Sequence, residues 1–238
     1  VYTADTFSNL VIFNPKVFAD HTLILTVTDA AGASASDKAT IRVSTNKTNM
    51  PPVVPKLRRD LNYADRLLAV ARSQVGYKES DENFIIEKGG KLQAWSFYGS
   101  EYGMPYEEWC AMFVSYCLKV AGVPEWAMPR SANCNRWRNA LGGRYVDDED
   151  GYVPEPGDLI FFHHDREGEN PDPNFPNHIG IVREYSERWN TVYTVEGNVG
   201  GKVVEKAYAL DDKTIVGYTS MRYVMERWDP NYMAKMPL

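Results

Sequence analysis

The sequence predicts an α+β fold, and two observations support this class. Helix-period apolar patterns occur between residues 57 and 141, whereas alternating apolar and polar residues, typical of strands, follow from residue 153 to residue 223. Helices that precede a run of strands are typical of α+β domains. The chain is also rich in aromatic residues, with 6 Trp, 15 Tyr and 9 Phe, which favours β-rich packing and clefts lined with rings.

Residues 1–45 predict a separate, incomplete β fragment. The segments "HTLILTVTD" (21–29) and "KATIRVS" (38–44) alternate around a turn-rich stretch and predict a hairpin, with "LVIF" (10–13) as a candidate third strand. The fragment resembles the last strands of an immunoglobulin-like or PKD-type module of bacterial surface proteins. Such modules need about 7 strands, so we expect at most half of one here, cut from an upstream repeat.

Residues 46–56, "NKTNMPPVVPK", have the polar and Pro-rich composition of a semi-rigid linker. The net charge of −6 divides unevenly around this segment. Residues 1–56 hold five Lys/Arg and four Asp/Glu, a net charge of +1, so residues 57–238 carry −7. We expect residues 57–238 to form one domain, which is long enough to bury about 70% of its unfolded surface.

Composition excludes some classes of function. The acidic balance offers no basic footprint for nucleic acid or for an anionic membrane surface. The longest apolar candidate for a membrane helix, 111–123, is interrupted by Lys119 and falls short of the roughly 20 residues required. The sequence shows no signal peptide, so we expect a mature form or an excised fragment if the protein is exported.

The large domain predicts three helices followed by an antiparallel meander. The first helix spans 63–76, with Leu67, Leu68, Ala71 and Val75 on one face and Gly76 as the C-cap. A long segment, 77–109, leads to a second helix that starts near Cys110 and ends at Gly122, and the third spans 132–141. The predicted strands are 158–162, 178–185, 191–197, 202–208 and 215–223.

The three cysteines suggest one reactive thiol. Cys110 starts its predicted helix, where the helix dipole favours the thiolate, although Glu107 and Glu108 oppose this effect. Cys117 lies two turns later and is predicted to be a buried apolar residue, while Cys134 either packs near Cys117 or pairs with it. No pair of cysteines has the short spacing of a zinc site, so we expect no metal at these thiols.

A cysteine nucleophile needs a base, and His178 is the best of the four histidines. A hairpin of 178–185 and 191–196 centred on residue 187 places His178 directly opposite Glu196, where the carboxylate can fix the imidazole tautomer. Gly180 and His178 then share one face with Glu196, and Ile179 and Ile181 point into a core. A bulge or a one-residue slip would spoil this register.

Four motifs appear in order: "WCAMFVSYC", "PEPGDLIFF", "HIGIV" and "YTVEGN", preceded by "VGYKE" and "YGSEYGMPYEEWC". Together they resemble the CHAP family, the cysteine- and histidine-dependent amidohydrolases and peptidases of bacterial and phage cell-wall enzymes, over roughly residues 66–223. The resemblance implies a papain-like fold, with Cys110 as nucleophile, His178 as general base, Glu196 as orienting acid and Asn198 as a supporting polar group. Trp109 and Glu196 argue against the sibling NlpC-type peptidases.

The resemblance also implies a substrate and a location. We expect an amidase or endopeptidase that cleaves peptidoglycan through a cysteine thioester, at a stem-peptide, cross-bridge or muramoyl-alanine bond. We expect it outside the cell or in the cell wall, of bacterial or phage origin, with further modules of a longer surface protein. Two alternatives stay open: a non-catalytic module that binds muropeptide, and an amidase of the glutathionylspermidine type that acts on a non-wall amide.

Several other residues are candidates for the cleft. Aromatic side chains predicted to bind substrate are Tyr102, Tyr106, Trp109 and Trp126, with Tyr98 as a further candidate for a cleft wall. His163 and His164 are either decoys or rim residues. We expect no cofactor: some CHAP members hold calcium, but the acidic segments 79–87, 147–151 and 165–174 lack the spacing of a calcium loop.

Overall fold

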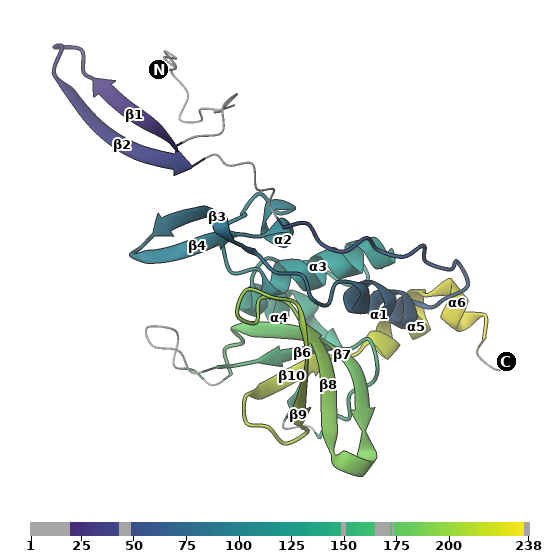
Figure 1. Ribbon diagram of the computed structural model, residues 1–238. Coiled ribbons are helices and arrows are strands. Elements are labelled where there is room, and N and C mark those ends of the chain that lie inside the picture. Colours follow the sequence, from purple (N-terminus) through teal and green to yellow (C-terminus); the bar gives the residue numbers. More distant parts are fainter. Residues whose placement is uncertain (1–19, 43–48, 149–150, 165–171, 173, 236–238) are drawn as a thin grey trace.

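The computed structural model describes residues 20–42, 49–148, 151–164, 172 and 174–235 (Figure 1). The candidate strand at 10–13 lies outside the described residues, as do most of the acidic segment 165–174 and part of the segment 147–151. Within the residues that the structure describes, no helix has both the length and the apolar character needed to span a membrane.

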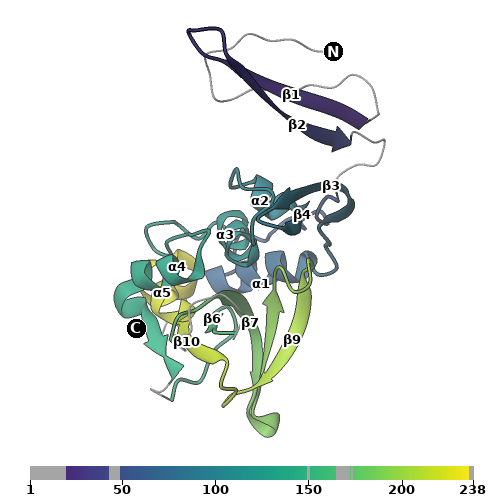
Figure 2. The same ribbon diagram turned by 90° about the vertical axis from the view of Figure 1, so that its left-hand side faces the viewer.

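The N-terminal region forms the predicted antiparallel hairpin, β1 (Asp20–Thr28) and β2 (Ser34–Arg42). The second strand starts at Ser34 and not at residue 38, because a tight turn reverses the chain: the Asp29 carboxylate accepts hydrogen bonds from the backbone N–H groups of Ala31 and Ala33. Figures 1 and 2 show this hairpin apart from the other elements. Ile24 is 66% exposed, as expected for a strand whose sheet is incomplete. The division of the chain into domains stays a prediction.

A six-stranded antiparallel sheet forms the base of the larger part, in the order β5-β10-β6-β7-β8-β9. The predicted meander holds from β6 to β9, but the last strand turns back and lies between β5 and β6. Mixed helices and antiparallel sheets are compatible with the predicted α+β class. The strands are β5 (Tyr145–Asp147), β6 (Leu159–Phe162), β7 (His178–Ser186), β8 (Thr191–Glu196), β9 (Val204–Ala209) and β10 (Ile215–Thr219).

The last predicted strand, 215–223, is too long. Strand β10 ends at Thr219 because Ser220 caps a new helix, α5 (Met221–Trp228): the Ser220 hydroxyl accepts a hydrogen bond from the backbone N–H of Tyr223. A short helix, α6 (Pro230–Met233), follows, with the Asp229 side chain as its cap.

Three helices match the predicted ones, with shifted ends: α1 (Tyr63–Ser73), α3 (Cys110–Ala121) and α4 (Cys134–Leu141). Helix α1 stops at Ser73 with Gln74 as its C-cap, so Val75 is 40% exposed and does not belong to the buried face as predicted. Helix α3 ends at Gly122, whose φ of 76° suits a left-handed C-cap. Helices α1 and α3 pack against each other and over one face of the sheet (Figures 1 and 2).

The segment 77–109, for which the sequence predicted no helix or strand, contains a second hairpin and a short helix. These are β3 (Ser80–Lys88), β4 (Lys91–Trp95) and α2 (Phe97–Ser100). The hairpin turns at Gly89 and Gly90, both with positive φ, so the "KGGK" stretch was a turn signal that the prediction missed.

The sheet separates two apolar clusters. Ile179, Ile181 and Val195 point toward the helices and join the main core, whereas Phe162 and Val182 point to the other face. His178 and Glu196, being in alternate positions, belong to this second face. The candidate site lies where the start of β7 and the end of β8 approach the first turn of α3.

Candidate active site

The start of α3 is held by Trp109, the residue before Cys110. Its indole stacks on Tyr98 at 5.3 Å, and its Nε1 donates a hydrogen bond to the Glu79 carboxylate at 2.9 Å. Trp109 is 1% exposed and Tyr98 is fully buried, so the prediction that they line a substrate cleft is wrong: both are core residues. Their packing fixes the point at which the helix, and with it Cys110, begins.

Cys110 is the first residue of α3 and is 7% exposed. The His178 imidazole and the backbone N–H of Ala111 both lie near enough to its sulfur to lower the pKa of the thiol. The Ala111 N–H is one of the groups that a helix leaves unsatisfied at its N-terminus, where partial positive charge favours an anion. The position therefore favours a thiolate, as the sequence predicted.

Strands β7 and β8 bring His178 and Glu196 together, but not by the predicted register. Glu196 lies directly opposite Gly180, and His178 is its diagonal neighbour. The side chains still meet: the distance from His178 Nε2 to Glu196 Oε2 is 2.9 Å. A Cβ at Gly180 would lie 2.7 Å from Glu196 Cγ, so the glycine leaves the space that the Glu196 side chain crosses to reach His178.

A bulge in β7 decides which face Glu196 occupies. Near the turn, Ser186 pairs with Thr191, and this register continued would place Glu196 opposite Ile181, on the helix-covered face. Between Val182 and Glu184 the register shifts by one residue, so that Glu196 instead shares the face of His178. The prediction that His178 and Glu196 are directly opposite each other was therefore wrong. The bulge, which was expected to prevent their contact, instead makes the contact possible.

Three donors hold the Glu196 carboxylate, whose side chain is fully buried. Oε2 accepts from His178 Nε2 and, at 3.2 Å, from the Tyr208 hydroxyl, while Oε1 accepts from the Thr194 hydroxyl. Burial alone would raise the pKa of Glu196, but the hydrogen bond and charge of His178 outweigh it and lower the pKa. Glu196 is therefore an ionised, immobile acceptor.

The His178 imidazole is stabilised in its protonated form. Burial alone would lower its pKa, but hydrogen bonds to Cys110 and Glu196 and the charges of both groups raise the pKa to about 9. The pKa of Cys110 lies well below that of a free thiol, chiefly through a hydrogen bond from Cys134, with His178 as a further cause against the opposing effect of burial. Both shifts favour a thiolate beside an imidazolium.

Part of the chain matches a known protein family. Residues 99–198 match the family model described as "CHAP domain". This segment of the chain is therefore similar to CHAP domains. The match runs from α2 to Asn198 and includes Cys110, His178 and Glu196, and it indicates a family of peptidoglycan amidases and peptidases.

Other comparisons add little to this similarity. No curated protein matches the chain. Among solved structures, "The crystal structure of Ly7917" matches with a TM-score of 0.37 and 16% sequence identity, over 66% of this chain and 62% of that chain. The chain thus spans less than two thirds of the length of that structure.

The Asn198 side chain forms its hydrogen bond with a residue other than His178. Asn198 follows β8 with a φ of 62°, and its Nδ2 donates to the carboxylate of Glu108, which precedes α3. The contact ties the loop after Glu196 to the segment before Cys110. A supporting role for Asn198 stays a prediction.

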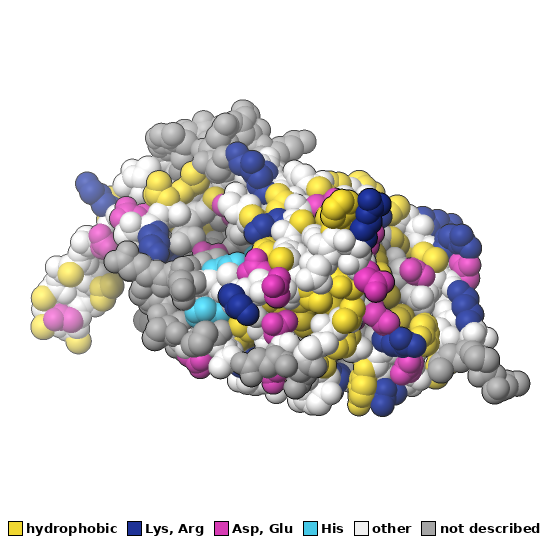
Figure 3. Space-filling view, turned by 90° about the horizontal axis from the view of Figure 1, so that it is seen from below, with side chains coloured by type: hydrophobic (Ala, Val, Ile, Leu, Met, Phe, Trp, Pro, Cys, Tyr) yellow, Lys and Arg dark blue, Asp and Glu magenta, His cyan; other side chains and the backbone are white. Residues whose placement is uncertain are grey.

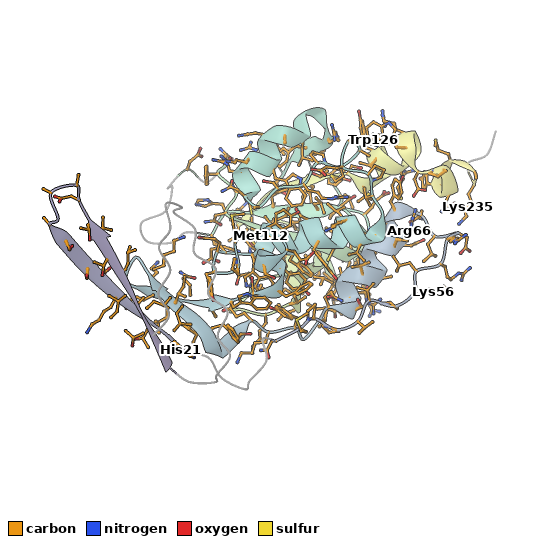
Figure 4. The ribbon with its side chains drawn as sticks, turned by 90° about the horizontal axis from the view of Figure 1, so that it is seen from above. His21, Lys56, Arg66, Met112, Trp126 and Lys235 are labelled. Atoms are coloured by element: carbon orange, nitrogen blue, oxygen red, sulfur yellow. The ribbon has the colours of Figure 1, made fainter. Side chains whose placement is uncertain are left out.

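Two aromatic candidates lie away from Cys110. Tyr102 lines a hollow of about 280 Å³ beside Tyr116 and Lys119, in the C-terminal half of α3. Trp126 is 65% exposed, but it lies beyond the C-terminal end of α3 against Trp228, far from Met112, which marks the first turn (Figure 4). A helix of this length spans about 18 Å, so Trp126 does not line a cleft at Cys110. Tyr106 is half-buried, and its contact with substrate stays a prediction.

Three neighbours of the site were not predicted. Cys134 contacts Cys110, and Thr194 and Tyr208 bind Glu196. The ring of His164, for which a rim position was only one of two alternatives, lies 5.6 Å from that of His178. Thr194 was detectable, because it precedes Glu196 by two residues on one strand. The others come from separate elements, and local sequence carries no signal for their contacts.

The histidine pair after β6 has two different roles. His163 is buried, with its Nδ1 2.7 Å from the carbonyl oxygen of Phe175, whereas His164 is partly exposed and stacks on Phe162. Histidine side chains reach the surface together on one face, beside acidic side chains (Figure 3). Among the described side chains, no group of three or more His, Cys, Asp or Glu is arranged to hold a metal ion.

Proposed function

We propose that this CHAP-like domain is a cysteine-dependent amidohydrolase or endopeptidase that cleaves an amide bond of peptidoglycan. The observation that carries the proposal is the placement of Cys110, at the N-terminus of α3, beside His178, which is hydrogen-bonded to Glu196 on one face of two strands. A nucleophile, a base and a group that orients the base are the parts that acyl transfer requires.

In the first step, the Cys110 thiolate attacks the carbonyl carbon of the amide. The C–N bond breaks as the His178 imidazolium gives its proton to the leaving amine, and a thioester to Cys110 remains. The Glu196 carboxylate, bonded to Nε2, keeps the other ring nitrogen, Nδ1, directed to the thiol and the substrate. The domain supplies every group in this step from its own side chains.

In the second step, water hydrolyses the thioester. Neutral His178 takes a proton from the water, the hydroxide attacks the carbonyl carbon, and the Cys110 thiolate leaves. The backbone N–H of Cys110, at the start of α3, is the proposed donor to the oxyanion, since helix N-termini point such groups outward. His178 returns to its protonated state in the same step.

The proposal has a structural and a cellular part. A helix that starts with the nucleophile and packs on an antiparallel sheet with the base supports a papain-like arrangement. Peptidoglycan as substrate supports action outside the cell or in the cell wall. The incomplete hairpin β1–β2 supports further modules in a longer surface protein.

Digestion of purified peptidoglycan tests the proposal. Walls with different stem peptides and cross-bridges are incubated with the native protein and with Cys110→Ala, and mass spectrometry locates each new amine and carboxylate. We expect new termini with the native protein alone, and their position names the bond. If neither protein produced new termini from any peptidoglycan, the proposal would be contradicted. That result would favour a module that binds muropeptide or an amidase that acts on an amide outside the wall.

A further inference from the structure

A second cysteine lies against the proposed nucleophile. The Sγ atoms of Cys110 and Cys134 are 3.7 Å apart, within hydrogen-bond distance for sulfur and well beyond the roughly 2.05 Å of a disulfide bond. Both side chains are buried, and the three cysteines, all within the described residues, form no disulfide. The proposed mechanism gives Cys134 no part, although it contacts the reacting sulfur.

A series of hydrogen bonds from α3 holds the segment before Cys134. The buried Ser115 hydroxyl donates to the carbonyl oxygen of Ser131 and accepts from its backbone N–H. The Ser131 hydroxyl, in turn, donates to the carbonyl oxygen of Asn133 and accepts from its N–H, and the Asn133 side chain caps α4. Cys134 is the first residue of α4, so the helix that carries Cys110 also fixes its position.

The Cys110 sulfur has three polar neighbours, each from a different source. His178 approaches from β7, the N–H of Ala111 from α3 itself, and the Cys134 thiol from α4. A thiolate has no proton to give, so in the contact between the two sulfurs Cys134 is the donor. The hydrogen bond from Cys134 is the largest cause of the lowered pKa of Cys110, which agrees with this direction.

We infer that Cys134 is a positioning residue, whose S–H group donates a hydrogen bond to the Cys110 thiolate and keeps the nucleophile ionised. The inference rests on the proposed function, in which Cys110 acts as an anion. The Cys134 thiol acts through Cys110: it replaces part of the solvation that a buried thiolate loses.

Alkylation of Cys110 by iodoacetamide across a range of pH tests the inference, because the thiolate is the reacting form. The rate at each cysteine is followed by peptide mass spectrometry in the native protein, Cys134→Ala and Cys134→Ser. In Cys134→Ala, we expect the pH midpoint for alkylation of Cys110 to rise by about one unit. Below that midpoint, Cys110 should therefore react roughly tenfold more slowly than in the native protein. Cys134→Ser should stay near the native midpoint, since a hydroxyl also donates.

Cys117→Ala is the matched control. Its thiol lies two turns along α3, and burial raises its pKa, so its removal should leave the Cys110 midpoint unchanged. If Cys134→Ala does not fold, Cys134→Val removes the donor while keeping side-chain bulk. The inference would be overturned if folded Cys134→Ala or Cys134→Val kept the native pH midpoint for Cys110 alkylation. It would also be overturned if Cys134→Ser shifted this midpoint as much as Cys134→Ala.

Alkylation needs no peptidoglycan, so the two proposals fail separately. If the protein digests no peptidoglycan but Cys134→Ala shows the expected shift in the pH midpoint of Cys110 alkylation, only the proposed function is contradicted. A protein that digests peptidoglycan yet keeps its midpoint in Cys134→Ala contradicts the role of Cys134 alone.

Discussion

Two carboxylates of the sheet region, Glu196 and Asp158, are equally buried and behave in opposite ways. Neither side chain is exposed. Asp158 precedes β6 and accepts hydrogen bonds from the backbone N–H groups of Met221 and Glu155 and from the Tyr152 hydroxyl, at 2.7 to 2.8 Å. Burial raises the pKa of Asp158 to about 6, whereas the pKa of Glu196 is lowered.

The difference comes from the partner and not from burial. Burial acts in the same direction on both groups, but Glu196 faces an imidazolium, while the donors to Asp158 are neutral. Asp158 joins the start of α5 to the loop before β6 and so has a structural role. Two equally buried acids, from the motifs "PEPGDLIFF" and "YTVEGN", thus have different roles: Asp158 holds the fold together and Glu196 holds a base.

Replacing the charge of each acid tests this division, and the largest effect is expected at Glu196. In Glu196→Gln, His178 loses the carboxylate that orients its ring and stabilises its protonated form. We therefore expect kcat/KM to fall by about 10²- to 10⁴-fold. Peptidoglycan digestion measures the rate, and circular dichroism checks that the variant is folded. Activity within a few-fold of native would show that Glu196 has only a structural role.

Gly180→Ala perturbs the same carboxylate without changing its charge. The added Cβ would lie 2.7 Å from Glu196 Cγ, which must move away from His178. Since small displacements of catalytic groups are costly, we expect a loss of about 10- to 100-fold in kcat. Gly143→Ala is the matched control, because its Cβ would meet nothing within 4 Å. Equal rates for the two variants would disprove the role of Gly180.

The pH dependence separates the two acids further. Activity should rise with pH as Cys110 ionises below its usual range, and fall near pH 9 as the His178 imidazolium loses its proton. Because Glu196 raises the pKa of His178, the alkaline fall should move to lower pH in Glu196→Gln and stay in place in Asp158→Asn. Profiles of kcat/KM for the three proteins provide the measurement, and an unmoved alkaline limb in Glu196→Gln would contradict the assignment.

The smallest effect on activity is expected at Asp158. In Asp158→Asn, the amide NH₂ cannot accept from backbone N–H groups, so the free energy of unfolding should fall by about 1–3 kcal/mol. The rate per folded molecule should remain within about twofold. Thermal unfolding and digestion rates at a temperature well below the transition test both parts. If Asp158→Asn were as stable as the native protein but lost most of its activity, Asp158 would have a catalytic and not a structural role.

Local sequence was sufficient to predict the helices around Cys110 and Cys134 and the strands that carry His178 and Glu196. Hydrophobic periodicity and turn residues are properties of neighbouring positions, so they indicate elements without the fold. The α5 helix and the β3–β4 hairpin were missed for a related reason. The serine cap lies inside an apolar run that also suits a longer strand, and the Gly-Gly turn lies between Lys88 and Lys91 in a segment for which no element was predicted.

By itself, the sequence determined the types and order of the reactive residues, the α+β class and the expectation that Cys110 starts a helix. Tertiary structure decided which of these residues meet. The bulge in β7 placed Glu196 on the face of His178, aromatic packing buried Trp109, and the bonds from Ser115 to Ser131 brought Cys134 to Cys110. Strand register and contacts between distant elements depend on how the whole core packs, and local patterns do not encode them.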